Sequence, residues 1–145
     1  MCGIAGFNLS KHETLDPRLL ASSLLLEIQA RGRDATGIAF VANKQVRIRK
    51  SPVPASKFLR QVQTIPEDVT NAILHTRYAT KGSPKNNANN HPIVSGRVVG
   101  VHNGHLTNDD AMFNHLDGVN RKGQVDSEAA FALLGATRHH PTDVL

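Results

Sequence analysis

Apolar and polar positions follow two patterns along this chain, and each pattern predicts a different kind of element. Short apolar runs bounded by polar or turn-forming residues are typical of strands that are buried on at least one face. Apolar residues spaced four apart, capping residues, and stretches rich in alanine and leucine are typical of helices. Strands are expected at 3–9, 37–41, 45–48, 72–77 and 98–102, and helices at 17–30, 55–63, 108–115 and 127–138.

Local signals mark the boundaries of these elements. The pair Asp16-Pro17 is typical of an N-cap followed by proline at the first helical position, and Gly32 can end that helix. The pair Asn43-Lys44 is expected to turn one strand into the next. Residues 80–90, rich in asparagine with glycine and proline, are expected to form a long polar loop.

The order of these elements indicates the fold class. Strand, helix, hairpin, helix, two strands and two helices do not form a regular alternation, which argues against a doubly wound parallel sheet. We expect one α+β domain with mixed sheets and helices packed outside them. A chain of 145 residues, 39% of them hydrophobic, is long enough to bury a sizeable core.

Composition and charge limit the classes of function and partner that are expected. The chain has a net charge of +5, but its densest basic stretch, 47–50, alternates with apolar residues like a half-exposed strand. With no tryptophan and one tyrosine, single-stranded nucleic acid is not an expected partner. No apolar run approaches the roughly 20 residues needed to span a bilayer. The single cysteine excludes an internal disulfide and fits a reducing cytoplasm, which is the expected location.

That single cysteine, Cys2, directly follows Met1 and is the most informative residue of the chain. Removal of Met1 would place a thiol and a free α-amine on one residue. Free thiols titrate at about 8.5 and α-amines at about 7.7–8.0, so the amine can act as base for its own thiol. A lone cysteine near a terminus is otherwise an inert residue. The apolar strand expected at 3–9 would anchor this one in a core.

Four polar segments beside expected strand ends could complete a site with Cys2: 31–37, 75–82, 102–108 and 126–128. Each also has a simpler interpretation. The pair Asn103-Gly104 could be a type I′ turn, Arg77 could be a structural ion-pair partner, and Asp126 could only cap a helix.

Histidines offer a weaker hypothesis. His102 and His105 are three residues apart and could bind a metal, but no cysteine or carboxylate is clustered beside them. No phosphate-binding glycine motif is present. We therefore expect neither a metal nor a cofactor, and we expect His139-His140 to be exposed.

Taken with Cys2, these segments resemble the class II glutamine amidotransferases, which have an N-terminal cysteine and belong to the N-terminal nucleophile (Ntn) hydrolases. The segments 75–80 and 90–92 are most similar to the glutaminase domain of glucosamine-6-phosphate synthase. Tyr78, where glucosamine-6-phosphate synthases usually have tryptophan, resembles the amidophosphoribosyltransferase branch instead. Lys81 stands where glucosamine-6-phosphate synthases usually have histidine. The residues that carry the resemblance are 1–6, 31–37, 75–80, 90–92, 102–104 and 126–128.

The resemblance implies a role for each matched residue. Cys2 would be the nucleophile, with its own amine as base. The Asn103 side-chain amide and the Gly104 backbone N–H would stabilise the oxyanion. Arg77 would bind the α-carboxylate of L-glutamine and Asp126 its α-ammonium group.

The resemblance also implies supporting roles. Thr80 and Gly82 would lie in the loop that closes over glutamine, and Arg31 and Asp34 would order the backbone near Cys2.

The implied fold is a four-layer αββα Ntn-hydrolase sandwich over 1–145, incomplete at its C-terminus and without a synthase domain. A synthase subunit or a missing C-terminal portion is then the expected partner. Two alternatives stay open. One is a non-catalytic module that binds glutamine or a partner protein. The other is a different Ntn amide hydrolase acting on acylated amines, against which Arg77 and Asp126 argue because a free amino-acid head group needs both charges.

Overall fold

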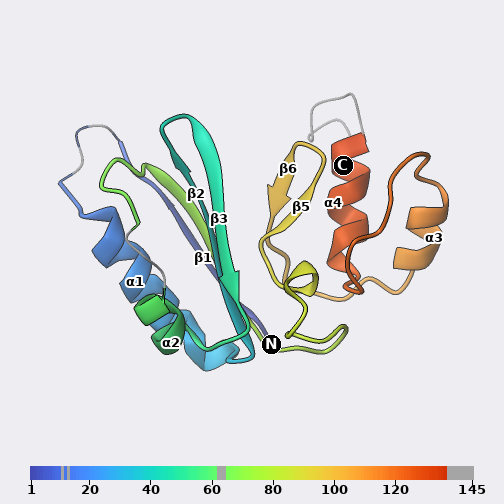
Figure 1. The fold of residues 1–145 in the computed structure, drawn as a ribbon, viewed down its shortest axis with the longest axis horizontal. Coiled ribbons are helices and arrows are strands. Elements are labelled where there is room, and N and C mark those ends of the chain that lie inside the picture. Colours follow the sequence, from blue (N-terminus) through green and yellow to red (C-terminus); the bar gives the residue numbers. More distant parts are fainter. Residues whose placement is uncertain (11, 13, 62–64, 137–145) are drawn as a thin grey trace.

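The computed structural model describes residues 1–10, 12, 14–61 and 65–136, and its elements form successive layers (Figure 1). Two helices cover one face of a four-stranded sheet, a two-stranded sheet faces the other side, and two further helices lie beyond it. The first sheet contains β1 (Gly3–Asn8), β2 (Ala35–Ala42), β3 (Gln45–Ser51) and β4 (Asn71–Arg77). The second contains β5 (Ile93–Ser95) and β6 (Val98–Gly100). The helices are α1 (Pro17–Ile28), α2 (Ala55–Gln61), α3 (Asp109–Asn114) and α4 (Ser127–Ala136), with short 3-10 turns η1 (Gln29–Arg31) and η2 (Asn87–Asn89).

The first sheet has the strand order β1-β4-β2-β3, and each neighbouring pair is antiparallel. The α+β class is confirmed, but the expectation of mixed sheets is wrong for the described strands. The reason is that β4 enters between β1 and β2, which run in the same direction, and it runs opposite to both. In the β1–β4 register, Gly3 lies opposite Thr76, so the start of the chain lies beside the end of β4.

Local signals in the sequence explain two of the boundaries. Asp16 caps α1, because its carboxylate accepts a hydrogen bond of 2.8 Å from the backbone N–H of Arg18. Asn43 and Lys44 have φ angles of 51° and 60°, the left-handed conformations that a two-residue type I′ hairpin turn requires. Both predictions are confirmed.

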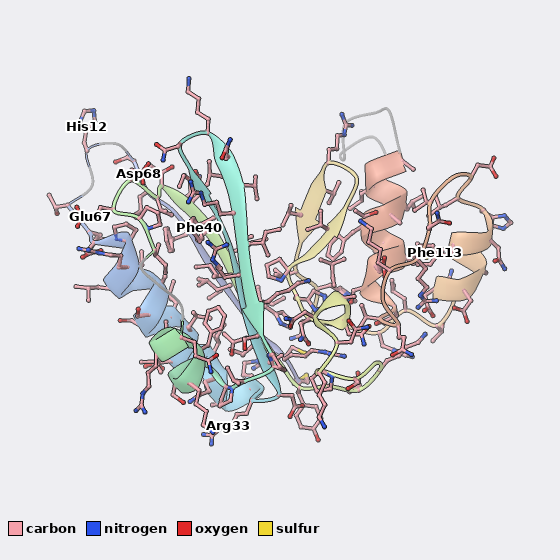
Figure 2. The ribbon with its side chains drawn as sticks, in the orientation of Figure 1. His12, Arg33, Phe40, Glu67, Asp68 and Phe113 are labelled. Atoms are coloured by element: carbon pink, nitrogen blue, oxygen red, sulfur yellow. The ribbon has the colours of Figure 1, made fainter. Side chains whose placement is uncertain are left out.

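The main core lies between the first sheet and its two helices. Leu25 of α1 and Phe58 of α2 pack on Ile38, Phe40 and Leu74 of the sheet, and Figure 2 labels Phe40 on this side. Full burial of such a side chain contributes about 1.5–3 kcal/mol. A smaller core joins the second sheet to α4 through Ile93, Val98, Phe131 and Leu134.

Other boundaries differ from the sequence-based expectation. Strand β5 was not predicted because three residues after a proline carry too little pattern. Strand β6 ends at Gly100, two residues before the predicted end, and α3 begins after Asn108 and ends before His115. The predicted helix ends at 62–63 and 137–138, and the pair His139-His140, lie outside the described residues. No helix among the described residues is both long and apolar enough to cross a membrane.

Candidate active site

Cys2 lies at the foot of the two sheets, near the N-terminus marked in Figure 1. The β1–β4 pairing brings its half-buried thiol against Tyr78, the first residue after β4. The backbone N–H of Tyr78 donates to Sγ at 3.4 Å, and Sγ lies 3.6 Å from the Tyr78 carbonyl oxygen. Met1 is 81% exposed, so the bond that must be cut to free the Cys2 amine is accessible.

The backbone carbonyl of Cys2 is held from two sides. Arg31 Nε and Asn103 Nδ2 each donate a hydrogen bond of 2.9 Å to it. The structure therefore brings Asn103 to Cys2 across most of the chain, and the expected place of Arg31 beside Cys2 is confirmed.

A second segment fixes the backbone that follows β4. Asp34 donates its backbone N–H to the Arg77 carbonyl at 2.9 Å, and its carboxylate accepts from the Ala79 N–H at 2.7 Å. Gly32 allows this close approach, because a Cβ there would lie 2.4 Å from the carbonyl carbon of Arg77. Asp34 thus orders the strand end next to Cys2, as expected.

The pair Asn103-Gly104 does not form a type I′ turn. Among the described residues, positive φ angles occur at Asn43, Lys44 and three glycines other than Gly104. The turn interpretation is therefore wrong. Instead, Gly104 lies against the His102 ring, where a Cβ would approach Nε2 to 2.6 Å.

Arg77 is only 4% exposed, and its guanidinium group is surrounded by neutral oxygens. Nη1 donates to Asn90 Oδ1 at 2.9 Å, and Nη2 donates to the carbonyl oxygens of Lys81 at 2.5 Å and Gly82 at 2.7 Å. Burial lowers the pKa of Arg77, and the negative forms of Cys2 and Asp34 oppose that shift. Arg77 forms no ion pair with a carboxylate among the described residues, so the structure does not support its interpretation as a structural ion-pair partner.

The loop after β4 is held by an ion pair of Lys81, whereas Thr80 is exposed to solvent. Lys81 Nζ lies 2.6 Å from Asp109 Oδ2, and the same oxygen is 2.6 Å from Arg121 Nη2. The hydrogen bond from Lys81 is the main cause that lowers the pKa of the buried Asp109 carboxyl. This chain of charges connects the loop to α3.

Asp126 lies just before α4, and its side chain is mostly buried. Its Oδ2 accepts a hydrogen bond of 2.6 Å from the Leu106 N–H and lies 3.5 Å from His105 Nδ1. The described side-chain partners of Asp126 therefore belong to the loop that carries Asn103, not to α4.

With this geometry established, comparison with known proteins decides the family. The family model described as "Glutamine amidotransferases class-II" matches residues 1–141. The chain belongs to the class II glutamine amidotransferases. The resemblance seen in the sequence is thereby confirmed, and the chain is a member of a family of enzymes.

Individual relatives of this amidotransferase chain carry the name glutamine–fructose-6-phosphate aminotransferase (isomerizing). The protein of Corynebacterium diphtheriae is 34% identical over 143 residues, covering 93% of this chain and 23% of the relative. That of Caulobacter vibrioides is 35% identical over 128 residues, covering 88% of this chain and 20% of the relative. The chain thus spans about a fifth of the length of these curated relatives.

Sequence reasoning missed two histidine rings that pack against each other in this amidotransferase chain. His75 on β4 and His91 have ring centroids 4.4 Å apart, and both side chains are buried. Burial lowers the pKa of His75 to about 4 and that of His91 to about 2, so both imidazoles are neutral near pH 7. Nε2 of His75 and both ring nitrogens of His91 have no hydrogen-bond partner among the described residues. No sequence signal pairs these residues, because His75 lies on β4 and His91 in the segment between η2 and β5.

The two histidines weighed as metal ligands in the sequence have separate partners. His102 Nδ1 lies 3.0 Å from Ser127 Oγ, and His105 faces Asp126. Within the described part of the chain, no group of three or more histidine, cysteine, aspartate or glutamate side chains could hold a metal ion.

Proposed function

We propose that this chain hydrolyses L-glutamine to L-glutamate and ammonia through a γ-glutamyl thioester on Cys2. The observation that carries the proposal is the convergence of the only thiol with Asn103, whose amide nitrogen lies 2.9 Å from the Cys2 carbonyl. Membership of the class II glutamine amidotransferases supports glutamine as the substrate.

The reaction requires that Met1 first be removed, because the Cys2 nitrogen is otherwise an amide. The free α-amine then accepts the thiol proton, and Sγ attacks the side-chain amide carbon of glutamine. The oxyanion that develops would be stabilised by the Asn103 amide and the Gly104 N–H, which favours the transition state over the ground state. As the C–N bond breaks, the proton passes from the amine to the departing ammonia. Water then attacks the thioester, the amine again acting as base, and releases glutamate and the thiol.

Arg77 supports recognition of the substrate carboxylate. A buried cation that bonds only neutral oxygens is costly to the fold unless an anion offsets its charge. An α-carboxylate near the guanidinium would supply that anion. Asp126, also largely buried, would supply the opposite charge for the α-ammonium group.

We further propose that 1–145 is the glutaminase domain of a larger system and has the four-layer αββα Ntn arrangement, incomplete at one side. The relatives are several times longer and are named as aminotransferases. The ammonia would therefore reach an acceptor site on a synthase portion, either in the same chain or in a separate subunit.

The test is a glutaminase assay combined with intact mass spectrometry. A protein carrying a cleavable N-terminal extension should be inactive until protease exposes Cys2, which compares one chain with itself. An electrophilic glutamine analogue should then add one mass to the parent and none to Cys2→Ala, since there is no second cysteine. Hydrolysis that survives Cys2→Ala, or a label on another residue, would refute the mechanism. Retained Met1 with glutamine binding but no turnover would favour the binding module.

A further inference from the structure

Asn90 is a buried residue that hydrogen-bonds both to the first sheet and to the loop that precedes it. Its side chain is fully inaccessible, and each of its polar atoms is bonded. Oδ1 accepts from Arg77 Nη1 at 2.9 Å, while Nδ2 donates to the Pro84 carbonyl at 2.7 Å and to Asn87 Oδ1 at 2.9 Å. The Asn90 carbonyl accepts from Lys50 Nζ at 2.7 Å.

We propose that Asn90 is a positioning residue that aims the Arg77 guanidinium at the α-carboxylate of glutamine and thereby sets glutamine affinity. The proposal rests on the function proposed above. A guanidinium is a planar fork, so its usefulness to a carboxylate depends on the direction of its plane. Of the three acceptors around Arg77, Asn90 supplies the one that is a side chain; the other two are carbonyls of Lys81 and Gly82.

The anchoring of Asn90 explains why it can set this direction. Lys50 on β3 donates to the carbonyls that flank His91, at 2.7 Å to Asn90 and 3.0 Å to Pro92. The backbone of Asn90 is therefore attached to the first sheet, which also carries Arg77 on β4, while its side-chain Nδ2 donates to Pro84 and Asn87 of the preceding loop. The carbonyls of Lys81 and Gly82 instead belong to the loop that would cover the substrate. Asn90 thus has an anchor on β3 in addition to its bonds within the loop.

Asn89 provides a matched control. It is the adjacent residue, has the same side chain and is equally buried. Its Nδ2 donates to the Ser83 carbonyl at 3.0 Å and to Gln124 Oε1 at 3.4 Å, and its Oδ1 accepts from the Gln124 N–H at 2.7 Å, whereas the hydrogen bonds of Arg77 go to Asn90, Lys81 and Gly82. If a substitution acts only by disturbing folding or the order of the loop, Asn89→Ala and Asn90→Ala should therefore change the kinetics to a similar extent.

The experiment compares the kinetics of glutamine hydrolysis per folded molecule in the parent, Asn90→Ala and Asn89→Ala. A lost hydrogen bond to a charged group predicts that Asn90→Ala raises KM about tenfold, while kcat changes by less than about twofold. Asn89→Ala should keep the parental KM. The competitive Ki of 4-aminobutanamide, which is glutamine without its α-carboxylate, should be the same in all three proteins.

A second variant guards against misfolding of the alanine protein. Asn90→Asp keeps the size and the acceptor for Nη1, loses the two bonds that Nδ2 donates to Pro84 and Asn87, and adds an anion beside the guanidinium, so it should raise KM for glutamine without changing the Ki of 4-aminobutanamide. Equal KM shifts in the Asn89 and Asn90 variants, an unchanged KM, or a parallel change in Ki would overturn the proposal. If the parent hydrolyses no glutamine, the proposed function fails. Calorimetric binding of glutamine to Cys2→Ala, with and without Asn90→Ala, then decides the role of Asn90, and absence of binding overturns it too.

Discussion

Acidification should destabilise this fold through the two imidazoles buried between its layers. Burial lowers the pKa of His75 to about 4 and of His91 to about 2, whereas an imidazole in the unfolded chain titrates near 6.5. Because the folded pKa lies below the unfolded one, the unfolded chain binds more protons below about pH 6.5. The contribution of the two neutral histidines to the free energy of unfolding is therefore fully present above that pH, and it is lost as the pH drops toward the folded pKa values.

The size of the effect follows from proton linkage. Each imidazole contributes about 1.4 kcal/mol per pH unit between its two pKa values. Between about pH 6.5 and pH 5 the free energy of unfolding should fall by about 2 kcal/mol for each, or about 4 kcal/mol for the pair. Both rings stay neutral in the folded protein over this range, so their mutual repulsion does not enter. The free energy of unfolding of a domain is only about 5–15 kcal/mol in total, so a loss of this size can be measured.

Urea denaturation at constant ionic strength, repeated from about pH 7.5 to pH 5, measures this slope. His91→Phe should halve the histidine contribution and leave stability near pH 7.5 close to that of the parent, because the ring nitrogens it removes have no described partner. His115→Phe, which replaces an exposed imidazole, is the control. The same pH slope in parent and His91→Phe would refute the reasoning.

Other substitutions test the site and the surface. Asn103→Ala should lower kcat by about 10²–10³, or roughly 2.7–4 kcal/mol, with little change in KM; unchanged kcat per folded molecule would remove it from the catalytic set. Arg77→Lys should raise KM for glutamine, because the charge stays but the fork is lost. Asp126→Asn keeps an acceptor for the Leu106 N–H but loses the charge, so it too should raise KM, and parental KM values would rule out both head-group roles. Val46 is 57% exposed and lines an apolar cavity between the two sheets. The protein should therefore self-associate through this surface, and Val46→Thr should reduce the association in sedimentation, whereas Leu19→Thr on the exposed face of α1 should not.

Elements with local signals could be predicted from the sequence. The capped start of α1 at Asp16 and the Asn43-Lys44 hairpin depend on residues within a few positions of each other, and the structure has both. Strand β5 could not be predicted because it exists through its pairing with β6 and its packing on Phe131 of α4. Antiparallel pairing throughout the first sheet likewise depends on where β4 inserts, which no short segment specifies.

The candidate site could be proposed from the sequence residue by residue, but the contacts between its residues could not. The sequence brought Cys2, Arg77, Asn103 and Asp126 forward as one set by their resemblance to a family, and family membership is confirmed. It gave no indication that Asn90 bonds Arg77. That bond depends on the path of the loop from residue 80 to 90, which tertiary contacts determine.

The costs of this fold are concentrated where its two halves meet. Arg77 is a buried cation bonded to neutral oxygens, and the neighbouring rings of His75 and His91 pack against each other with three ring nitrogens that have no hydrogen-bond partner among the described residues. Well-packed apolar residues in such places are often neutral or stabilising, so stability alone does not account for these groups. Cys2, whose negative form opposes the downward shift in the Arg77 pKa, lies within electrostatic reach of that cation. The contact between the layers therefore holds a buried positive charge near Cys2 that no carboxylate hydrogen-bonds among the described residues.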